Sequence, residues 1–423
     1  MDVVCLYLYS LKLLDILEGH TNYSTLPYLD INIKKILFGP FIECGQQKNP
    51  FLHACKKGYL PVAQHFREYD INYLNHDYEA FKIACANGHL EIAQWLHTLG
   101  EIDIHAKWDS LFIEACEDGH FEIAQWLHTF GGVNIHATEE HAFRSACRHG
   151  HLKIAQWLHS FGTVDIHAEG ECAFRAACEY GHLKIAQWLH SLGKVNIHAE
   201  RDHAFRSACW NGHLKIAQWI HTLGGVNIHT YDDEAFRIAC SYGHFKIAQW
   251  LRTLGEVNIH SHDDDAFRSA CLNGHFEIAQ WLFTLGEVDI HAGGDAAFRN
   301  ACANGHLEIA QWLHTFGKID IRAKRDAAFR YACSNGHLKI AQWLHTLAKI
   351  DIHAKMDYAF RSACENGHLE IAQWLYSLDR TKFSKMLPNI LSMRVQPHIV
   401  RWINALSESS LEPPTKKKKK NYE

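Results

Sequence analysis

The chain has 423 residues, of which 47% are hydrophobic and 21% are charged, a balance that excludes an intrinsically disordered protein. Its net charge is −5, from 42 lysines and arginines against 47 aspartates and glutamates. Five lysines stand together at 416–420, so the rest of the chain is acidic and lacks the charge of a general nucleic-acid-binding protein. No run of 18 apolar residues occurs, and the sequence therefore predicts no membrane span.

Residues 1–49 are predicted to form an N-terminal cap region. They begin with MDVVCLYLYSLKLLDIL, an apolar run that lacks a basic start and is interrupted by Lys12 and Asp15. These features argue against a signal peptide. We interpret the run as an amphipathic helix that packs on the residues that follow.

Residues 50–380 repeat with a period of 31. Cysteines mark the period at 55, 85, 116, 147, 178, 209, 240, 271, 302, 333 and 364. Ten tryptophans, at 95 and every 31 residues up to 374, follow the same spacing. The unit D-x-A-F-R-x-A-C-x-N-G-H-L-x-I-A-Q-W-L-H-T-L-G-x-V-D-I-H-A recurs ten times, with a weaker copy at 51–66. A period of this length predicts a stack of helical repeats in which neighbours bury each other's apolar faces.

One unit shows the elements that are expected in each. Residues 79–86 are predicted to form a short helix that ends at Gly88, because glycine takes the left-handed conformation at no steric cost. Residues 90–99 are predicted to form a second helix, which ends at Gly100. Its apolar stripe consists of Ile92, Ala93, Leu96 and Leu99. An extended segment then leads to a tight turn at 107–109.

This unit resembles the ankyrin repeat family. The family pattern aligns with EAFKIACANGHLEIAQWLHTLGEIDIHA at 79–106, with matches at Gly88, His89, Leu90, Glu91, Ile92, Leu96, Gly100, Asp103 and Ala106. The resemblance implies an all-α, ankyrin-type solenoid of about 11–12 stacked helix-turn-helix units. Two departures stand out: A-F-R replaces the family's T-P-L-H, and the shorter period implies a shortened hairpin finger. Short, tryptophan-rich arrays of this style are similar to those of giant viruses of amoebae.

The end of the chain is predicted to close the stack. Residues 381–406 are interpreted as a degenerate C-terminal capping unit, because PHIVRWI at 397–403 echoes the second helix of a repeat. Its first helix is expected at 382–394. Residues 407–423 are expected to be a disordered basic tail. Its lysines, Lys416, Lys417, Lys418, Lys419 and Lys420, resemble a short nuclear-import signal, with a solvated charge run as the alternative.

The cysteines, histidines and tryptophans that recur in each repeat are interpreted as structural. Stacked units lie about 10 Å apart, which is too far for their cysteines to share a zinc ion or form disulfides. We expect free, buried thiols and a reducing compartment. The histidines at 97 and 105 and their equivalents are expected to hydrogen-bond loop backbone, with pH sensing as the alternative. The tryptophans are expected in the core, with base or methyl-lysine stacking as the alternative.

The sequence predicts no enzyme and no cofactor. A catalytic site is a unique constellation, whereas each recurring Cys, His and Trp here has many equivalents. Phosphate-binding glycine loops, G-x-S-x-G and H-E-x-x-H are also missing from the sequence.

A partner-binding face is expected where the repeats differ from one another. Positions that stay the same hold the stack together, and positions that vary are free to contact a partner on the concave face. The candidate residues are Trp108, Tyr180, Trp210, Tyr231, Tyr242, Arg325, Tyr331 and Met356. Glu139 and Glu140 belong to the same variable set. Drift on a solvated surface is the alternative explanation.

These observations predict a non-catalytic scaffold that binds an unidentified protein partner. We expect a monomer in the cytoplasm, with the nucleus as the alternative, and no membrane, small-molecule or nucleic-acid partner. One competing hypothesis is an adaptor for a ubiquitin ligase, because Leu387–Leu391 faintly resembles the start of an F-box. The other is a nuclear protein that uses the lysine tail as an arm for nucleic acid.

Overall fold

The computed structural model describes residues 50–69, 76–100, 106–286 and 288–409, and in these ranges the regular structure consists of 24 helices and no strand. Paired in chain order, the helices form 12 helix-turn-helix units, so the predicted all-α class is confirmed. None of the described helices is long and apolar enough to cross a membrane. The predicted cap at 1–49 and the lysines at 416–420 lie outside the described residues.

The chain divides into two compact units, Met1–Val195 (unit 1) and Asn196–Glu423 (unit 2). Unit 1 contains α3 (Pro50–Lys57), α4 (Leu60–Tyr69), α5 (Asp77–Ala86), α6 (Leu90–Leu99), α7 (Ala106–Glu117), α8 (Phe121–Thr129), α9 (Ala137–Arg148), α10 (Leu152–His159), α11 (Ala168–Glu179) and α12 (Leu183–Ser191). Unit 2 contains α13 (Ala199–Trp210), α14 (Leu214–Leu223), α15 (Thr230–Ser241), α16 (Phe245–Leu254), α17 (Ser261–Asn273), α18 (Phe276–Thr284), α19 (Ala292–Ala303), α20 (Leu307–Thr315), α21 (Ala323–Ser334), α22 (Leu338–Leu347), α23 (Ala354–Glu365), α24 (Leu369–Leu378), α25 (Arg380–Leu391) and α26 (Pro397–Ser409).

A glycine turn joins the two helices of each pair. Gly88 follows α5 with a φ of +79°, in the left-handed region that glycine enters freely. The backbone N–H of His89 donates to the carbonyl oxygen of Ala84 over 2.9 Å, which satisfies a carbonyl at the end of α5. The second helix then spans Leu90–Leu99, the range that the sequence predicts.

A histidine from the next repeat packs onto this glycine. His120 places Nε2 3.1 Å from the carbonyl oxygen of Ala86, and a Cβ atom on Gly88 would lie 2.8 Å from the imidazole ring. The position therefore needs glycine for the approach of the ring as well as for the turn. The same bond recurs in His89–Lys56, His151–Glu117, His244–Trp210 and His306–Leu272. Consecutive repeats within each unit are thus linked by imidazole-to-carbonyl bonds.

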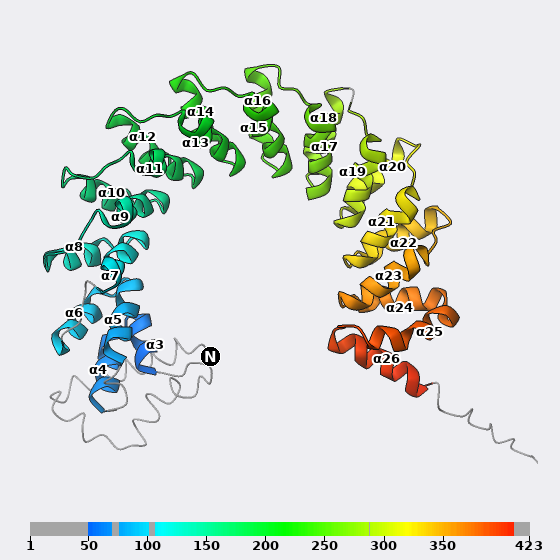
Figure 1. Ribbon diagram of the computed structural model, residues 1–423, viewed down its shortest axis with the longest axis horizontal. Helices are drawn as coiled ribbons and strands as arrows, with labels where there is room; N and C mark the ends of the chain where they lie inside the picture. The colour runs from blue at the N-terminus through cyan, green and yellow to red at the C-terminus, as the bar shows by residue number, and fades with distance from the viewer. Residues whose placement is uncertain (1–49, 70–75, 101–105, 287, 410–423) are drawn as a thin grey trace, which may run out of the picture. The chain divides into compact units, whose positions relative to one another are not determined.

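The core is a row of phenylalanines, one from each first helix. In α5, Phe81 is fully buried beside Ala84 and Cys85, and Ile92 and Leu96 of α6 close the other side. Burial of a side chain as large as phenylalanine stabilises the fold by about 1.5–3 kcal/mol. First helices pack on first helices, α9 on α11 in unit 1 and α17 on α19 in unit 2. In Figure 1 the first helices α15, α17 and α21 of unit 2 lie on the inner side of the arc that this unit traces, and the second helices lie outside them.

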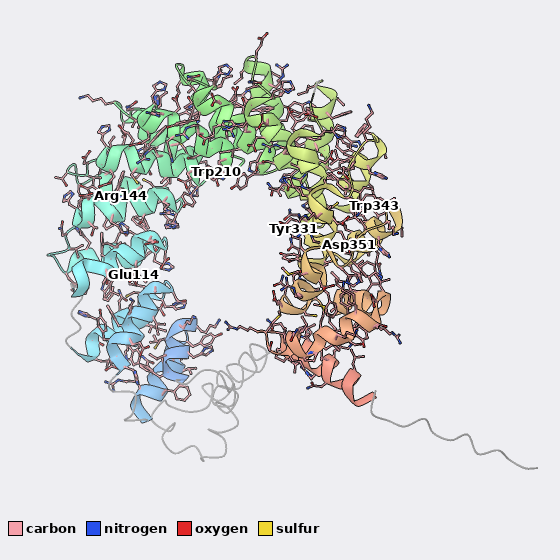
Figure 2. The ribbon with its side chains drawn as sticks, turned by 45° about the vertical axis from the view of Figure 1, so that its right-hand side comes forward. Glu114, Arg144, Trp210, Tyr331, Trp343 and Asp351 are labelled. Atoms are coloured by element: carbon pink, nitrogen blue, oxygen red, sulfur yellow. The ribbon has the colours of Figure 1, made fainter. Side chains whose placement is uncertain are left out.

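Two apolar positions are less buried than predicted. Leu99 is 42% exposed, so the buried stripe of the second helix ends at Leu96. The recurring tryptophans are half-buried and do not belong to the innermost core. Trp126, for example, packs across the repeat boundary against Phe81, with the ring centroids 6.0 Å apart. Trp343 of unit 2 marks the equivalent position in Figure 2.

The histidines at the end of the second helices have a different partner from the one predicted. The ring of His97 lies 5.7 Å from that of Trp126 in a T-shaped arrangement. His221 and Trp250 repeat this contact at 5.7 Å in unit 2. These histidines therefore extend the aromatic packing between repeats, a contact that the expected bond to loop backbone does not include.

The last two described helices form one more pair, α25 and α26. The carboxylate of Asp379 accepts a hydrogen bond of 2.9 Å from the backbone N–H of Lys382 and caps the start of α25. Phe383 stacks on Phe360 of the preceding repeat with centroids 4.3 Å apart, so it continues the phenylalanine row. The residues that resemble an F-box lie inside α25, where Leu387 and Ile390 are buried.

Candidate interaction site

A left-handed turn connects each repeat to the next between 138 and 357. Three consecutive residues have positive φ, as in Tyr231, Asp232 and Asp233 at 54°, 55° and 59°. The equivalent triplets are 138–140, 169–171, 200–202, 262–264, 293–295, 324–326 and 355–357. This conformation costs about 1–2 kcal/mol for each residue other than glycine, so the turn needs contacts that hold it.

An arginine supplies the first of these contacts. Arg237 donates from Nε to the carbonyl oxygen of Asp232 at 3.0 Å and from Nη2 to that of Tyr231 at 3.1 Å. Arg144, Arg175, Arg206 and Arg330 make the same pair of bonds. The arginine of A-F-R is therefore the residue that holds the left-handed turn, which gives a physical reason for the departure from T-P-L-H.

A buried carboxylate at the third turn residue supplies the second contact. Asp233 is 5% exposed and lies 2.6 Å from Nδ1 of His229, the residue that directly precedes α15. Its other oxygen accepts from the backbone N–H of Asn258 in the next repeat at 2.9 Å. Histidines that precede the turn thus bond a carboxylate and not the backbone as predicted. Glu140 occupies the same buried position next to His136, so its assignment to the variable surface is wrong.

The cysteines are free, and all but one of the twelve described are buried, as predicted. Burial raises the pKa of Cys85 and Cys364 to about 12, which keeps these thiols protonated at neutral pH. Cys172 is the partly exposed exception. Across the described residues, no group of three or more His, Cys, Asp or Glu side chains is placed to hold a metal ion.

Six of the predicted contact residues are exposed. Trp210 is 44% exposed, Tyr242 52% and Met356 80%, while Tyr180, Tyr231 and Tyr331 lie between 40% and 46%. Arg325 is also exposed, on the left-handed turn at the start of α21. Trp108 belongs to α7, but its side chain lies outside the described part of the structure.

The structure brings two of these aromatic residues together. Trp210 at the end of α13 and Tyr242 after α15 have ring centroids 5.7 Å apart. The labels of Trp210 and Tyr331 in Figure 2 mark positions on first helices of unit 2. Tyr231 and Tyr180 are instead held by arginines of their own units: Arg206 lies 4.8 Å above the Tyr231 ring, and Arg148 lies 4.7 Å above the Tyr180 ring.

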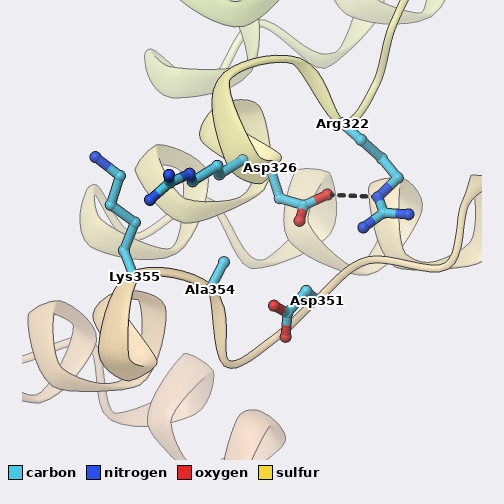
Figure 3. Close-up of a pocket in the computed structure, with 6 residues that line it drawn as sticks. Arg322, Asp326, Asp351, Ala354 and Lys355 are labelled. Atoms are coloured by element: carbon cyan, nitrogen blue, oxygen red, sulfur yellow. Dashed lines mark hydrogen bonds and ion pairs between the residues drawn. The ribbon is translucent and has the colours of Figure 1, made fainter.

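Two hollows lie beside the predicted residues in unit 2. The first has a volume of about 550 Å³ and is lined by Arg322, Arg325, Asp326, Asp351, Ala354 and Lys355. In Figure 3, Arg322 points toward Asp326, and its Nε lies 3.3 Å from Oδ1 of that carboxylate. Arg322 therefore takes the place of the histidine found at this position in other repeats. With both signs of charge present, this hollow has no strong preference for one kind of ion.

The second hollow has a volume of about 320 Å³ and a one-sided charge. It is lined by Arg299, Asn300, Ala303, Lys324, Ala327, Arg330, Tyr331 and Lys355. The sequence predicts Tyr331 as a contact residue but does not single out Arg299 and Arg330, because both belong to the A-F-R motif that recurs in the repeats. A sequence signal could have distinguished these arginines from their equivalents. Arg206 and Arg237 are followed 28 residues later by a carboxylate, whereas Arg299 is followed by Ala327.

A family model described as ankyrin repeats (3 copies) matches residues 112–200, 205–293, 267–356 and 298–386, which together make up more than half of the chain. A comparison with curated proteins gives no match.

Proposed function

The chain belongs to the ankyrin repeat family, and on this premise we propose that it is a non-catalytic scaffold that binds a partner protein through its first helices and left-handed turns. Ankyrin repeats indicate protein–protein interaction and, typically, no enzymatic role. The finer part of the proposal is the choice of face.

The observation that carries the proposal is the separation of two kinds of position. Turn residues that face solvent differ from repeat to repeat, whereas the buried carboxylate and the arginine beneath them recur. Exposed aromatic residues accumulate on this variable surface, with Trp210 and Tyr242 as neighbours. Tyrosine, tryptophan and arginine are the residues that most often dominate the binding energy of protein interfaces.

The second-helix surface is less suited to selecting a partner. Its half-buried tryptophan recurs in each repeat and packs against the repeat before it, as Trp126 does. A surface made of the same residue at each step offers little to distinguish one partner from another. We therefore propose that specific recognition takes place on the surface of the first helices and left-handed turns.

Affinity capture tests the choice of face. The full chain and the double variant Trp210→Ala/Tyr242→Ala are used to capture proteins from the same lysate, with Leu347→Ala as the control. Leu347 is exposed at the end of a second helix, so its loss removes apolar surface from the layer that is not proposed to bind. We expect the control to retain a stoichiometric partner and the double variant to lose it. Equal recovery of the partner by the double variant and the control would contradict the proposed binding face. Ubiquitin-ligase subunits in the eluate would favour the adaptor hypothesis.

We infer a cytoplasmic location, with import into the nucleus depending on Lys416–Lys420. These lysines lie outside the described residues, so the inference rests on the sequence alone. In a fluorescent fusion, deletion of 415–423 is expected to remove the nuclear fraction of the protein and to leave the cytoplasmic fraction. An unchanged distribution would remove the import signal from the proposal.

A further inference from the structure

The turn arginines of unit 2 fall into two groups. Nη1 of Arg206 lies 2.6 Å from Oε2 of Glu234, and Nη1 of Arg237 lies 3.1 Å from Oδ2 of Asp265. In both pairs the carboxylate stands 28 residues after the arginine, on the next first helix. The guanidinium groups of α13 and α15 are therefore neutralised inside the stack.

The carboxylate is missing from the next repeats. At the corresponding positions after Arg268, Arg299 and Arg330 the chain has Ala296, Ala327 and Tyr358. Nη1 of Arg299 is buried and has no hydrogen-bond partner in the structure. A buried charged donor without a partner destabilises the fold, so a ligand that supplies an acceptor removes that penalty.

Arg299 lines the second hollow together with three other positively charged side chains. Arg299, Lys324, Arg330 and Lys355 line it, and no aspartate or glutamate is among the described side chains that do so. Neither Lys324 nor Lys355 has a carboxylate within ion-pair distance in the described part of the chain, and both are exposed. Beside them the exposed ring of Tyr331 lies 5.5 Å from the Arg330 guanidinium.

We propose that this hollow binds the carboxylate side chains of an acidic segment of the partner protein, a proposal that rests on the scaffold function above. A glutamate or aspartate from the partner takes the place that Glu234 and Asp265 occupy in the earlier repeats and bonds the guanidinium of Arg299. Lys324 and Lys355 attract a second carboxylate of the same segment, and Tyr331 packs on its apolar atoms. The binding is electrostatic and weakens with added salt.

A protein segment fits this hollow better than a nucleic acid does. The chain itself shows the geometry in which such an arginine takes a carboxylate. A nucleic acid needs positive charge along its backbone, whereas the chain carries a net charge of −5 and the first hollow, which shares Lys355 with this one, contains Asp326 and Asp351. The four positively charged side chains thus form a local anion-binding site on a protein whose net charge is negative.

The test uses a fluorescein-labelled decapeptide of alternating glutamate and tyrosine, followed by fluorescence anisotropy with the full chain. A second peptide has glutamine in place of glutamate, and a decanucleotide of single-stranded DNA is the third probe. The first variant is Lys324→Glu/Lys355→Glu, and its control is Lys339→Glu/Lys349→Glu, which changes the net charge equally at exposed sites elsewhere in unit 2. We expect the glutamate peptide alone to bind, with at least a tenfold loss in the first variant and none in the control.

A third variant, Ala327→Glu, places a carboxylate in the chain where Glu234 and Asp265 stand in the earlier repeats. We expect the new carboxylate to occupy the hollow and to lower the affinity for the glutamate peptide tenfold or more. The melting temperature is expected to stay the same or to rise. Equal binding of the glutamine peptide, tighter binding of the DNA, or unchanged binding in Lys324→Glu/Lys355→Glu would overturn the proposal. If that variant still captures the partner that Trp210→Ala/Tyr242→Ala loses, the scaffold stands and the acidic site alone fails.

Discussion

At the level of single residues, burial decides the chemistry of the thiols. Cys85 is among the eleven buried cysteines, and its raised pKa of about 12 leaves almost no thiolate at pH 7.5. We expect iodoacetamide to label Cys172 in the native protein and the buried cysteines only after denaturant is added. Peptide mapping by mass spectrometry reads each site separately. Equal labelling of Cys172 and Cys85 in the native state would show that the repeats open far more readily than their packing implies.

Glycine has two roles in the repeat: it adopts a positive φ, and at some positions it leaves room for a histidine ring. A pair of substitutions separates these two roles. Gly119 and Gly131 both have positive φ, at +84° and +74°. A Cβ atom at Gly119 would clash with the His151 ring, whereas one at Gly131 would meet nothing within 4 Å. Gly131→Ala is expected to cost about 1 kcal/mol for the backbone alone. Gly119→Ala also displaces the bond from His151 to Glu117, which adds about 1 kcal/mol. Urea unfolding of both variants measures the difference, and equal losses would mean that the histidine contact contributes nothing.

At the level of the elements, the left-handed turn depends on one buried carboxylate. Asp264 is buried, lies 2.6 Å from Nδ1 of His260 and accepts from the backbone N–H of Asp289 at 3.1 Å. Asp264→Asn keeps the size of the side chain but cannot accept both bonds as a charged group, and a loss of about 1–3 kcal/mol is expected. Asp263→Asn, one residue away and exposed, is the control and is expected to change stability by less than about 0.5 kcal/mol. The melting temperatures of the two variants make the comparison, and a similar shift in both would exclude a structural role for the carboxylate.

The helices could be predicted from the sequence, whereas the turn could not. Gly88 and Gly100 flank an apolar run of known period, so the second helix of that repeat was predicted at the residues where it lies. The turn triplets, in contrast, look like solvated loops, because polar side chains predominate in them. Nothing in the letters shows that the third residue points inward to His229 while the first two face solvent. That distinction comes from the backbone angles of the turn, which a one-dimensional period does not encode.

The candidate site was predicted in part for a similar reason. Variation between repeats selects exposed positions such as Trp210 and Tyr331, and both are exposed in the structure. It passes over Arg299, which is the same residue in most repeats, although its surroundings differ once Ala327 replaces a carboxylate. A functional difference at an unchanged residue is visible only when its neighbours in space are known.

For the whole molecule, a set of half-buried histidines predicts a dependence of stability on pH. Burial lowers the pKa of His151, His275 and His337 below the ordinary value of 6.5. The unfolded chain therefore binds more protons than the folded chain just below pH 6.5, so stability is complete above that pH and declines as the pH falls through this range. We expect a lower melting temperature at pH 5.5 than at 7.5, and a smaller decline after replacement of all three histidines by glutamine. A melting temperature that stays flat would dismiss the effect.

The way in which the left-handed turns are held also bears on how readily such a protein can acquire a new partner. Arg237 holds the turn through the backbone carbonyls of Tyr231 and Asp232, and the side chain that fixes the turn belongs to the third residue. These bonds do not use the side chains of the first two turn residues, although the Tyr231 ring also lies under the guanidinium of Arg206. Mutation can rewrite these side chains without unfolding the repeat, and an experimenter can randomise them as a library. The same stack could in this way be directed to many targets, with its folding left unchanged.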